Sequence, residues 1–102
     1  MGRGRKPRKT VDDYTEVRCA SGTGVIREEV WEDELGQVVK YNLAFIHPLY
    51  LEDNGRVLGY DNAHGVNERH YKGEVQEITY TEYDALLERF LAEVRELRRK
   101  QL

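Results

Sequence analysis

The last twenty residues carry apolar side chains at helical spacing, and this stripe constrains the fold more than any other feature. Thr81 suits the N-cap position, and Asp84, three residues later, resembles the acidic partner of a capping box. The stripe comprises Tyr83, Leu86, Leu87, Phe90, Leu91, Val94 and Leu97. A small sheet needs such a cover, so the stripe predicts a core contact with the rest of the chain rather than a groove for a partner.

The residues before this helix predict strands. Residues 38–51 show the clearest pattern, with alternate apolar residues on one face at Val39, Tyr41, Leu43 and Phe45. Asn54-Gly55 is a strong signal for a hairpin turn. Further strands are expected at 14–20, 25–34, 56–62 and 70–80. The predicted fold class is α+β: a small antiparallel sheet of four or five strands covered by one C-terminal helix.

Charge divides the chain into two parts. Residues 1–10 contain five of the 16 lysines and arginines and no acid, while the remaining eleven cations are outnumbered by 19 acidic residues. The basic residues are Arg3, Arg5, Lys6, Arg8 and Lys9. Glycine, proline and the lack of an aromatic residue are typical of disorder. We therefore expect a disordered basic tail at 1–10 and a single α+β domain at 11–102.

The tail has features of a nucleic-acid-binding element. Arg3-Gly4-Arg5 resembles the centre of an AT-hook, in which glycine lets the backbone enter the minor groove and arginines follow its negative potential. The proline that precedes this core in AT-hooks is missing, and Lys6 stands before Pro7. A solubilising or non-specific nucleic-acid tail is therefore the broader interpretation, with DNA or RNA as partner.

The sequence also indicates a cellular compartment. The longest apolar run, residues 43–46, is far shorter than a membrane span, and no apolar segment follows the N-terminal cations as it would in a secretion signal. Cys19 is the single cysteine, so no internal disulfide can form, and we expect it to contribute packing rather than chemistry. These features predict a cytoplasmic protein without a membrane partner.

Residues 60–72 concentrate the groups that can move protons or hold a phosphate. Two of the three histidines lie there. The candidate site residues are Tyr60, Asp61, Asn62, His64, Arg69, His70, Tyr71 and Lys72. Asp and Asn also hydrogen-bond to local backbone in turns, so a purely structural strand end is the alternative to a site.

His64 and His70 flank a short turn, and they approach each other if the flanking strands pair. One would take the proton of an RNA 2′-hydroxyl and the other would protonate the leaving oxygen, while Arg69 or Lys72 stabilises the phosphorane. Asp61 would hold one imidazole in a fixed tautomer. Substrate contacts would come from Tyr60 and Tyr71. This chemistry requires no metal or other cofactor.

A metal site is a second interpretation of the same segment. It would use Asp61, His64 and His70, with His47 as a further candidate. Their spacing matches no compact zinc pattern and no cysteine pair accompanies them, so we expect no metal. His47 stands just before Pro48 at the end of an apolar strand, and we expect it to be partly buried with its hydrogen bonds satisfied.

The block Gly59-Tyr60-Asp61-Asn62-Ala63-His64, followed by Arg69-His70-Tyr71-Lys72-Gly73, resembles the signature of the TumE-like toxins. These are small proteins of bacterial and archaeal toxin–antitoxin operons. The resemblance covers residues 38–97 and implies an RNA-directed toxin, a ribonuclease, with a helix-turn-helix antitoxin as partner. The site that it implies is Tyr60, Asp61, Asn62, His64 and His70. Members of this family carry several histidines in the segment that follows the loop. The roles of those histidines fall here on Arg69, His70 and Lys72.

A non-enzymatic interpretation stays open. The basic tail would hold nucleic acid while the sheet and helix bind a partner protein, without turnover. RNA approaches an acidic body poorly unless a second copy or a cationic partner changes the charge balance, so a homodimer also stays open.

Overall fold

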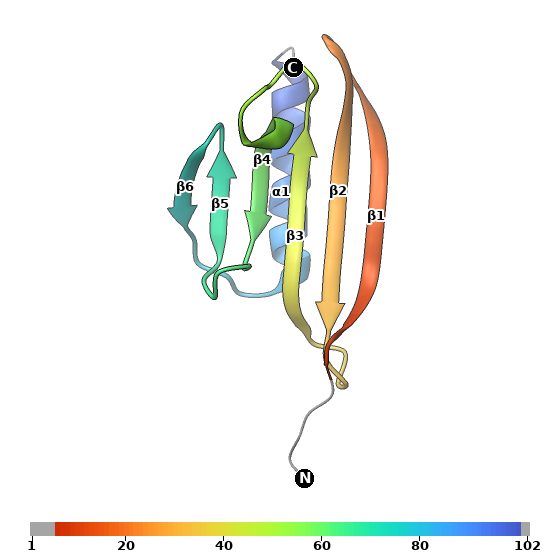
Figure 1. Ribbon diagram of the computed structural model, residues 1–102, viewed down its shortest axis with the longest axis vertical. Coiled ribbons are helices and arrows are strands. Elements are labelled where there is room, and N and C mark those ends of the chain that lie inside the picture. Colours follow the sequence, from red (N-terminus) through yellow and green to blue (C-terminus); the bar gives the residue numbers. More distant parts are fainter. Residues whose placement is uncertain (1–5, 101–102) are drawn as a thin grey trace.

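The computed structural model describes residues 6–100, which form an α+β domain of two layers (Figure 1). Its elements are β1 (Arg8–Cys19), β2 (Gly22–Glu32), β3 (Val38–Ile46), a 3-10 turn η1 (Asp53–Gly55), β4 (Arg56–Asp61), β5 (Glu68–Tyr71), β6 (Glu74–Glu77) and α1 (Tyr83–Arg99). The six strands found within this range pair antiparallel in chain order. The predicted fold class and C-terminal helix are confirmed, but the sheet has six strands rather than four or five. No helix between residues 6 and 100 is long and apolar enough to cross a membrane.

The additional strand comes from the segment 70–80, which the sequence predicts as one strand. Lys72 (φ 48°) and Gly73 (φ 86°) both adopt left-handed backbone, and they reverse the chain so that Tyr71 pairs with Glu74. Two consecutive positive φ values match the twist of paired strands, which makes this a natural hairpin turn. Because the first turn position is a lysine, the turn does not match the Asn-Gly and Asp-Gly dipeptides that usually indicate a hairpin in a sequence.

β1 is longer than expected and includes part of the predicted tail. It begins at Arg8, so the boundary predicted between residues 10 and 11 falls inside the strand. The Lys9 ammonium lies 2.6 Å from a Glu29 carboxylate oxygen and 5.1 Å from the centre of the Trp31 ring. Cross-strand charge and aromatic contacts thus order residues that composition alone marks as disordered.

The connection between β3 and β4 is also longer than a simple hairpin. β3 ends at Ile46 rather than at residue 51, because Pro48 cannot donate to a ladder. The chain reverses through residues 47–55. Asn54 (φ 55°) and Gly55 (φ 85°) supply the left-handed backbone that the Asn-Gly signal predicts.

His47 anchors this connection. Its Nδ1 accepts a hydrogen bond from the Leu49 backbone N–H at 3.1 Å, so Nε2 carries the proton and donates to Ser21 Oγ, also at 3.1 Å. The side chain is fully buried. The expectation of a satisfied histidine is confirmed, with deeper burial than expected, and His47 is thereby held away from the candidate site.

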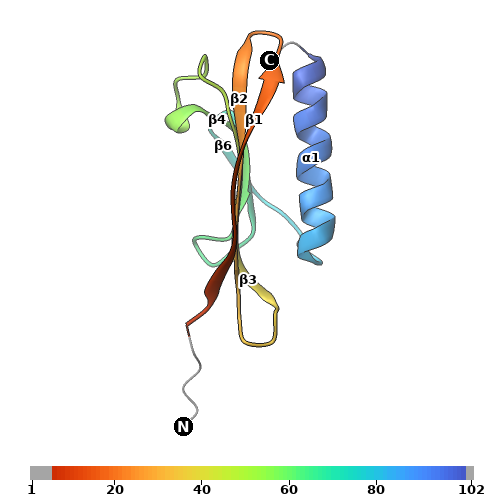
Figure 2. The ribbon, with the colours of Figure 1, turned by 90° about the vertical axis from the view of Figure 1, so that its right-hand side faces the viewer.

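α1 covers one face of the sheet, and the opposite face, called the open face below, carries no α-helix, although the β3–β4 connection projects on that side (Figure 2). Its buried side chains are Leu86, Phe90 and Val94. They share one core cluster with Cys19, Tyr41, Leu43, Phe45, Leu58 and Tyr60. The helical stripe is therefore a core contact, as predicted. The N-cap is Glu82 rather than Thr81, and it makes no side-chain capping bond.

Candidate functional site

The alternation of side chains along β4 and β5 places three candidate groups on the open face of the sheet. Asp61 is the cross-strand partner of Glu68, and His70 follows Glu68 by two residues. Side chains two residues apart in a strand point to the same face, as do those of cross-strand partners. The helix covers the opposite face (Figure 2), so these three groups lie on the side that a ligand can approach.

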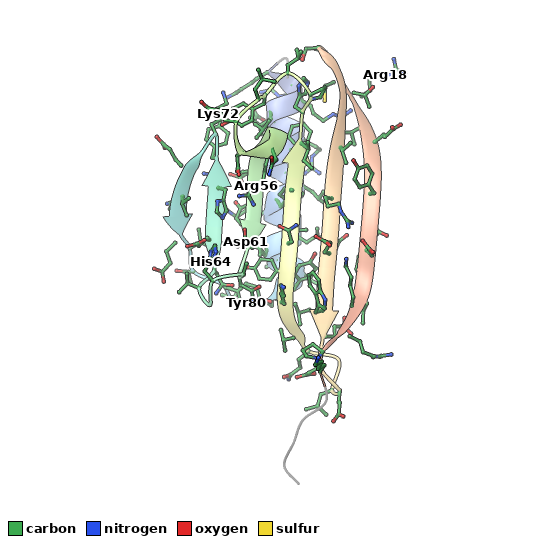
Figure 3. The ribbon with its side chains drawn as sticks, viewed as in Figure 1. Arg18, Arg56, Asp61, His64, Lys72 and Tyr80 are labelled. Atoms are coloured by element: carbon green, nitrogen blue, oxygen red, sulfur yellow. The ribbon has the colours of Figure 1, made fainter. Side chains whose placement is uncertain are left out.

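Two imidazoles converge on the carboxylate of Glu68. His64 Nδ1 lies 3.6 Å from Glu68 Oε1, and His70 Nε2 lies 3.5 Å from the same oxygen. His70 Nε2 is also 3.1 Å from Asp61 Oδ2. Figure 3 shows Asp61 and His64 close together at the end of β4. The structure thus brings together three residues that the sequence analysis selected, around a fourth, Glu68, that it did not.

The members of this cluster differ in their access to solvent. The His64 side chain is 77% exposed on the loop between β4 and β5, whereas that of His70 is 11% exposed and that of Asp61 is 10% exposed. His70 Nε2 is enclosed and makes no aligned hydrogen bond within the described residues, despite its short distance to Asp61. The Asp61 carboxylate is thus close to His70 Nε2 without an aligned hydrogen bond, although buried polar atoms in folded proteins are usually hydrogen-bonded.

Arg56 adds a cation that the sequence analysis missed. Its Nη1 lies 3.3 Å from Asp61 Oδ2, because Val57 has no partner in the β3–β4 register and this bulge brings Arg56 onto the open face. A Cβ at Gly59 would lie 2.6 Å from Arg56 Cδ. Gly59 therefore leaves the space through which the guanidinium reaches Asp61, and a glycine inside a strand is the sequence signal for such a close approach.

Two residues expected in the site lie instead on the helix-covered face. Tyr60 Oη donates a hydrogen bond to Glu93 of α1, and Arg69 Nη2 lies 2.8 Å from Glu93 Oε2. Because Tyr60 and Arg69 are cross-strand partners, both point away from Asp61. They tie the sheet to the helix, and neither adjoins the imidazole cluster.

The remaining candidates are also held apart from the cluster. The Tyr71 ring contacts the Arg69 guanidinium and the Lys72 ammonium, at 5.2 and 5.5 Å from its centre, and Lys72 belongs to the β5–β6 turn. Asn62 extends the ladder between β3 and β4: its Oδ1 accepts from the Tyr41 backbone N–H and its Nδ2 donates to the Val39 carbonyl, each at 3.1 Å.

Raising the pH through the range from about 10 to about 12 is expected to lower the free energy of unfolding. Burial, and then the contact with Glu93, raises the pKa of Tyr60 to about 12, whereas a tyrosine in the unfolded chain ionises near 10. Burial also raises the pKa of Tyr41 and of Tyr83. Above pH ~10 the unfolded chain has lost protons that the folded chain keeps, so stability present below that pH is lost as the pH rises.

Urea unfolding at several alkaline pH values measures this effect. Tyr60→Phe should weaken the dependence of the unfolding free energy on pH. Tyr14→Phe, at a tyrosine that is 67% exposed, should leave that dependence as in wild type. An unfolding free energy that stays constant between pH ~9 and ~11 would contradict the predicted linkage.

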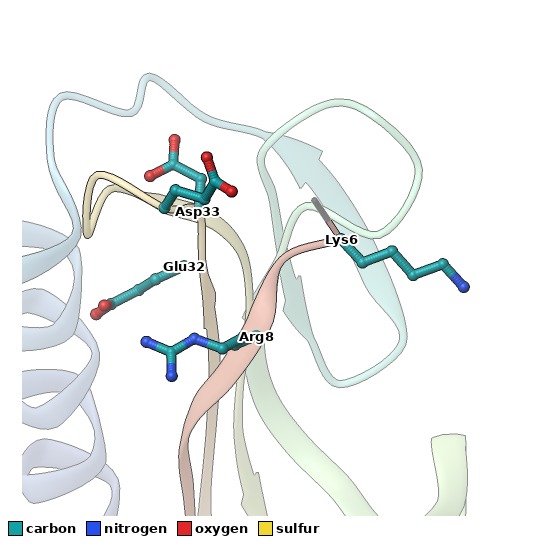
Figure 4. Close-up of a pocket in the computed structure, with 5 residues that line it drawn as sticks. Lys6, Arg8, Glu32 and Asp33 are labelled. Carbon is teal, nitrogen blue, oxygen red and sulfur yellow. The ribbon is translucent and has the colours of Figure 1, made fainter. Parts of the chain in front are cut away.

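The basic segment meets acidic residues at the start of β1. Lys6 and Arg8 line a surface pocket with Glu32, Asp33 and Glu34 (Figure 4). Arg8 is the cross-strand partner of Glu32, and the Lys6 side chain points away from the acids. A pocket of mixed charge is poorly suited to phosphate. Arg3 and Arg5 lie outside the described residues.

Comparison with known proteins adds an independent line of evidence. The family described as Toxin TumE matches residues 8–98, a range that contains all six strands and all but the last residue of α1. No curated protein and no solved structure is similar enough to count as a match. Because the family match spans most of the chain, it confirms the resemblance drawn from the loop motif. The chain belongs to the TumE toxin family.

Proposed function

We propose that this toxin attacks RNA, with His64 and His70 acting as general acid and general base. The observation that carries the proposal is the approach of both imidazoles to one oxygen of Glu68, at 3.6 and 3.5 Å. Histidine suits proton transfer in either direction near neutral pH. A pair of histidines with a nearby cation is a sufficient set for cleavage of RNA.

In the proposed reaction, His70 takes the proton of a ribose 2′-hydroxyl while the 2′-oxygen attacks the adjacent phosphorus. The bond from phosphorus to the 5′-oxygen breaks, and His64 gives that oxygen a proton, which leaves a 2′,3′-cyclic phosphate and a free 5′-hydroxyl. The base is assigned to His70 because Asp61, 3.1 Å from its Nε2, would orient the ring and stabilise the imidazolium, so that Nδ1 takes the proton. The exposed His64 is free to follow the leaving strand.

Arg56 takes the role of the cation in this proposal, in place of Arg69 or Lys72. Its guanidinium contacts Asp61 on the open face through Nη1 and Asp53 through Nε, whereas Arg69 is held by Glu93 on the helix-covered face, away from the imidazoles. A guanidinium offers several donors in one plane, which suits the equatorial oxygens of a phosphorane.

The proposal also covers the partners. Membership of a toxin family implies an antitoxin, and we propose one with a helix-turn-helix that holds the toxin inactive in the cytoplasm. The cations Arg3, Arg5 and Lys6, which precede β1 in the chain, would add electrostatic affinity for RNA.

Inducible expression in a bacterial host tests the proposal. Wild type should arrest growth and deplete RNA, whereas His64→Ala/His70→Ala should do neither at the same protein level. The matched control, Gln37→Ala/Gln76→Ala, truncates two exposed polar side chains without changing charge and should remain toxic. Toxicity that survives the loss of both histidines would refute the assigned chemistry. A well-expressed wild type without effect on growth or RNA would favour the non-enzymatic binding module.

A further inference from the structure

The cluster on the open face has the donor set of a transition-metal site. One ligand atom each from Asp61, His64 and Glu68 lie within 4.8 Å of one another. His70 Nε2 adjoins two of these residues, at 3.1 Å from Asp61 Oδ2 and 3.5 Å from Glu68 Oε1. Two imidazoles and two carboxylates are therefore available around one centre.

The spacing of these atoms agrees with tetrahedral coordination. Around an ion with bonds of about 2.0–2.2 Å to nitrogen and oxygen, tetrahedral ligand atoms lie about 3.3–3.6 Å apart. The contacts from His64 to Glu68 and from His70 to Glu68, at 3.6 and 3.5 Å, fall in or at the edge of that range, and the contact from His70 to Asp61, at 3.1 Å, is slightly shorter. Small side-chain adjustments, with His64 free on its loop, would complete the coordination.

The state of His70 is a second, independent observation. Its Nε2 is enclosed and has no aligned hydrogen-bond partner among residues 6–100, although leaving a buried polar atom in this way destabilises a fold. The nitrogen faces the carboxylate oxygens of Asp61 and Glu68. An ion between these groups would use the nitrogen lone pair directly.

The surroundings hold one ligand in place and leave charge to be neutralised. The Ala63 backbone N–H donates to Asp61 Oδ1 at 3.2 Å, and Arg56 approaches Oδ2 at 3.3 Å, so that this carboxylate is oriented as metal ligands usually are. Arg56 also pairs with Asp53, at 2.8 Å, so one guanidinium accompanies the carboxylates of Asp53, Asp61 and Glu68, which leaves a net negative site when the imidazoles are neutral. Imidazole donors favour zinc and its transition-metal neighbours over magnesium or calcium.

We infer that Asp61, His64 and Glu68, with His70 as the fourth donor, bind one divalent transition-metal ion of the zinc class. A bound ion takes the place of the proton between His70 Nε2 and Asp61 and occupies His64 Nδ1, and its positive charge makes both rings poorer proton acceptors. If the proposed function holds, on which this consequence rests, the ion therefore inhibits RNA cleavage and its removal activates the toxin.

Titration of the purified, chelator-treated chain with Co²⁺ tests the site, with visible absorption and calorimetry as readouts. We expect one ion per chain with the intense absorption of tetrahedral coordination. His64→Ala and Glu68→Gln should each lower the affinity for Co²⁺ by about 100-fold. The control is Glu74→Gln, at the exposed cross-strand partner of Tyr71 on β6, which lies on the other face of the sheet from the cluster and should bind as wild type does.

The outcomes separate the site from the function. Absent binding, or binding that His64→Ala and Glu68→Gln leave unchanged while circular dichroism shows them folded, overturns the metal site whatever the protein does to RNA. Binding at the site together with no RNA cleavage by the metal-free chain leaves the site standing and removes the proposed function. Cleavage that Co²⁺ stimulates rather than stops overturns the inhibitory consequence.

Discussion

Replacing His70 with alanine is expected to slow RNA cleavage by the purified, metal-free chain by about 10²–10⁴-fold, the usual contribution of a positioned general base. Of the two imidazoles in the cluster, His70 is the one that the fold positions more firmly, between Asp61 at 3.1 Å and Glu68 at 3.5 Å. Its removal takes away the proton acceptor without disturbing Arg56 or the exposed His64. Cleavage of a defined oligonucleotide, with detection of the 2′,3′-cyclic phosphate, measures the effect.

Controls in the same assay separate chemistry from folding. Added imidazole should restore part of the activity of His70→Ala, because the truncated side chain leaves space for it, and a merely structural role would not give this rescue. Arg56→Ala should also be slow, by about 10²-fold or more, whereas Arg95→Ala, at an exposed helix position, should match wild type. An unchanged rate in folded His70→Ala protein would remove His70 from the reaction.

Replacing Phe90 with alanine is expected to lower the free energy of unfolding by about 3–5 kcal/mol. The Phe90 side chain is fully buried, and its ring meets Tyr60 edge to face at 6.1 Å between centres. It joins α1 to the centre of the sheet, so its loss leaves a cavity in the contact between the two layers. For a domain with a total stability of about 5–15 kcal/mol this is a large fraction.

Urea unfolding followed by circular dichroism measures the loss. Glu88→Ala, on the exposed side of the same helix, is the matched control and should change stability by less than about 0.5 kcal/mol. If Phe90→Ala lowered the free energy of unfolding as little as Glu88→Ala, α1 would not be the cover of the sheet. Its apolar stripe would then have to bind a partner protein.

Local patterns were sufficient to predict the helix and most strands of this fold. The apolar stripe from Tyr83 to Leu97 specifies a helix with one buried face, and the alternation at Tyr41, Leu43 and Phe45 specifies a strand with its core side. Both follow from the 3.6- and 2-residue periods, which act over neighbouring positions of the chain. The strand count was missed at Lys72 and Gly73, because a lysine at positive φ gives no compositional signal.

The composition of the site was predictable only in part. The sequence predicts residues 60–72 as a place where titratable groups gather, and the structure brings Asp61, His64 and His70 of this segment to Glu68. The family resemblance drawn from the segment was confirmed. Adjacent residues in a strand point to opposite faces, however. The contiguous motif is therefore divided by the sheet: Asp61, Glu68 and His70 lie on the open face, and Tyr60 and Arg69 lie against the helix.

The sequence by itself determined the fold class, the helical cover of the sheet and the segment that carries the imidazoles, because each of these depends on neighbouring residues. Only the tertiary structure decided which groups meet. The pairing of Asp61 with Glu68 brings both acids to His70, and the bulge at Val57 carries Arg56 to Asp61 over the bare backbone of Gly59. Strand register and a bulge set these contacts, and both arise from interactions between segments distant along the chain.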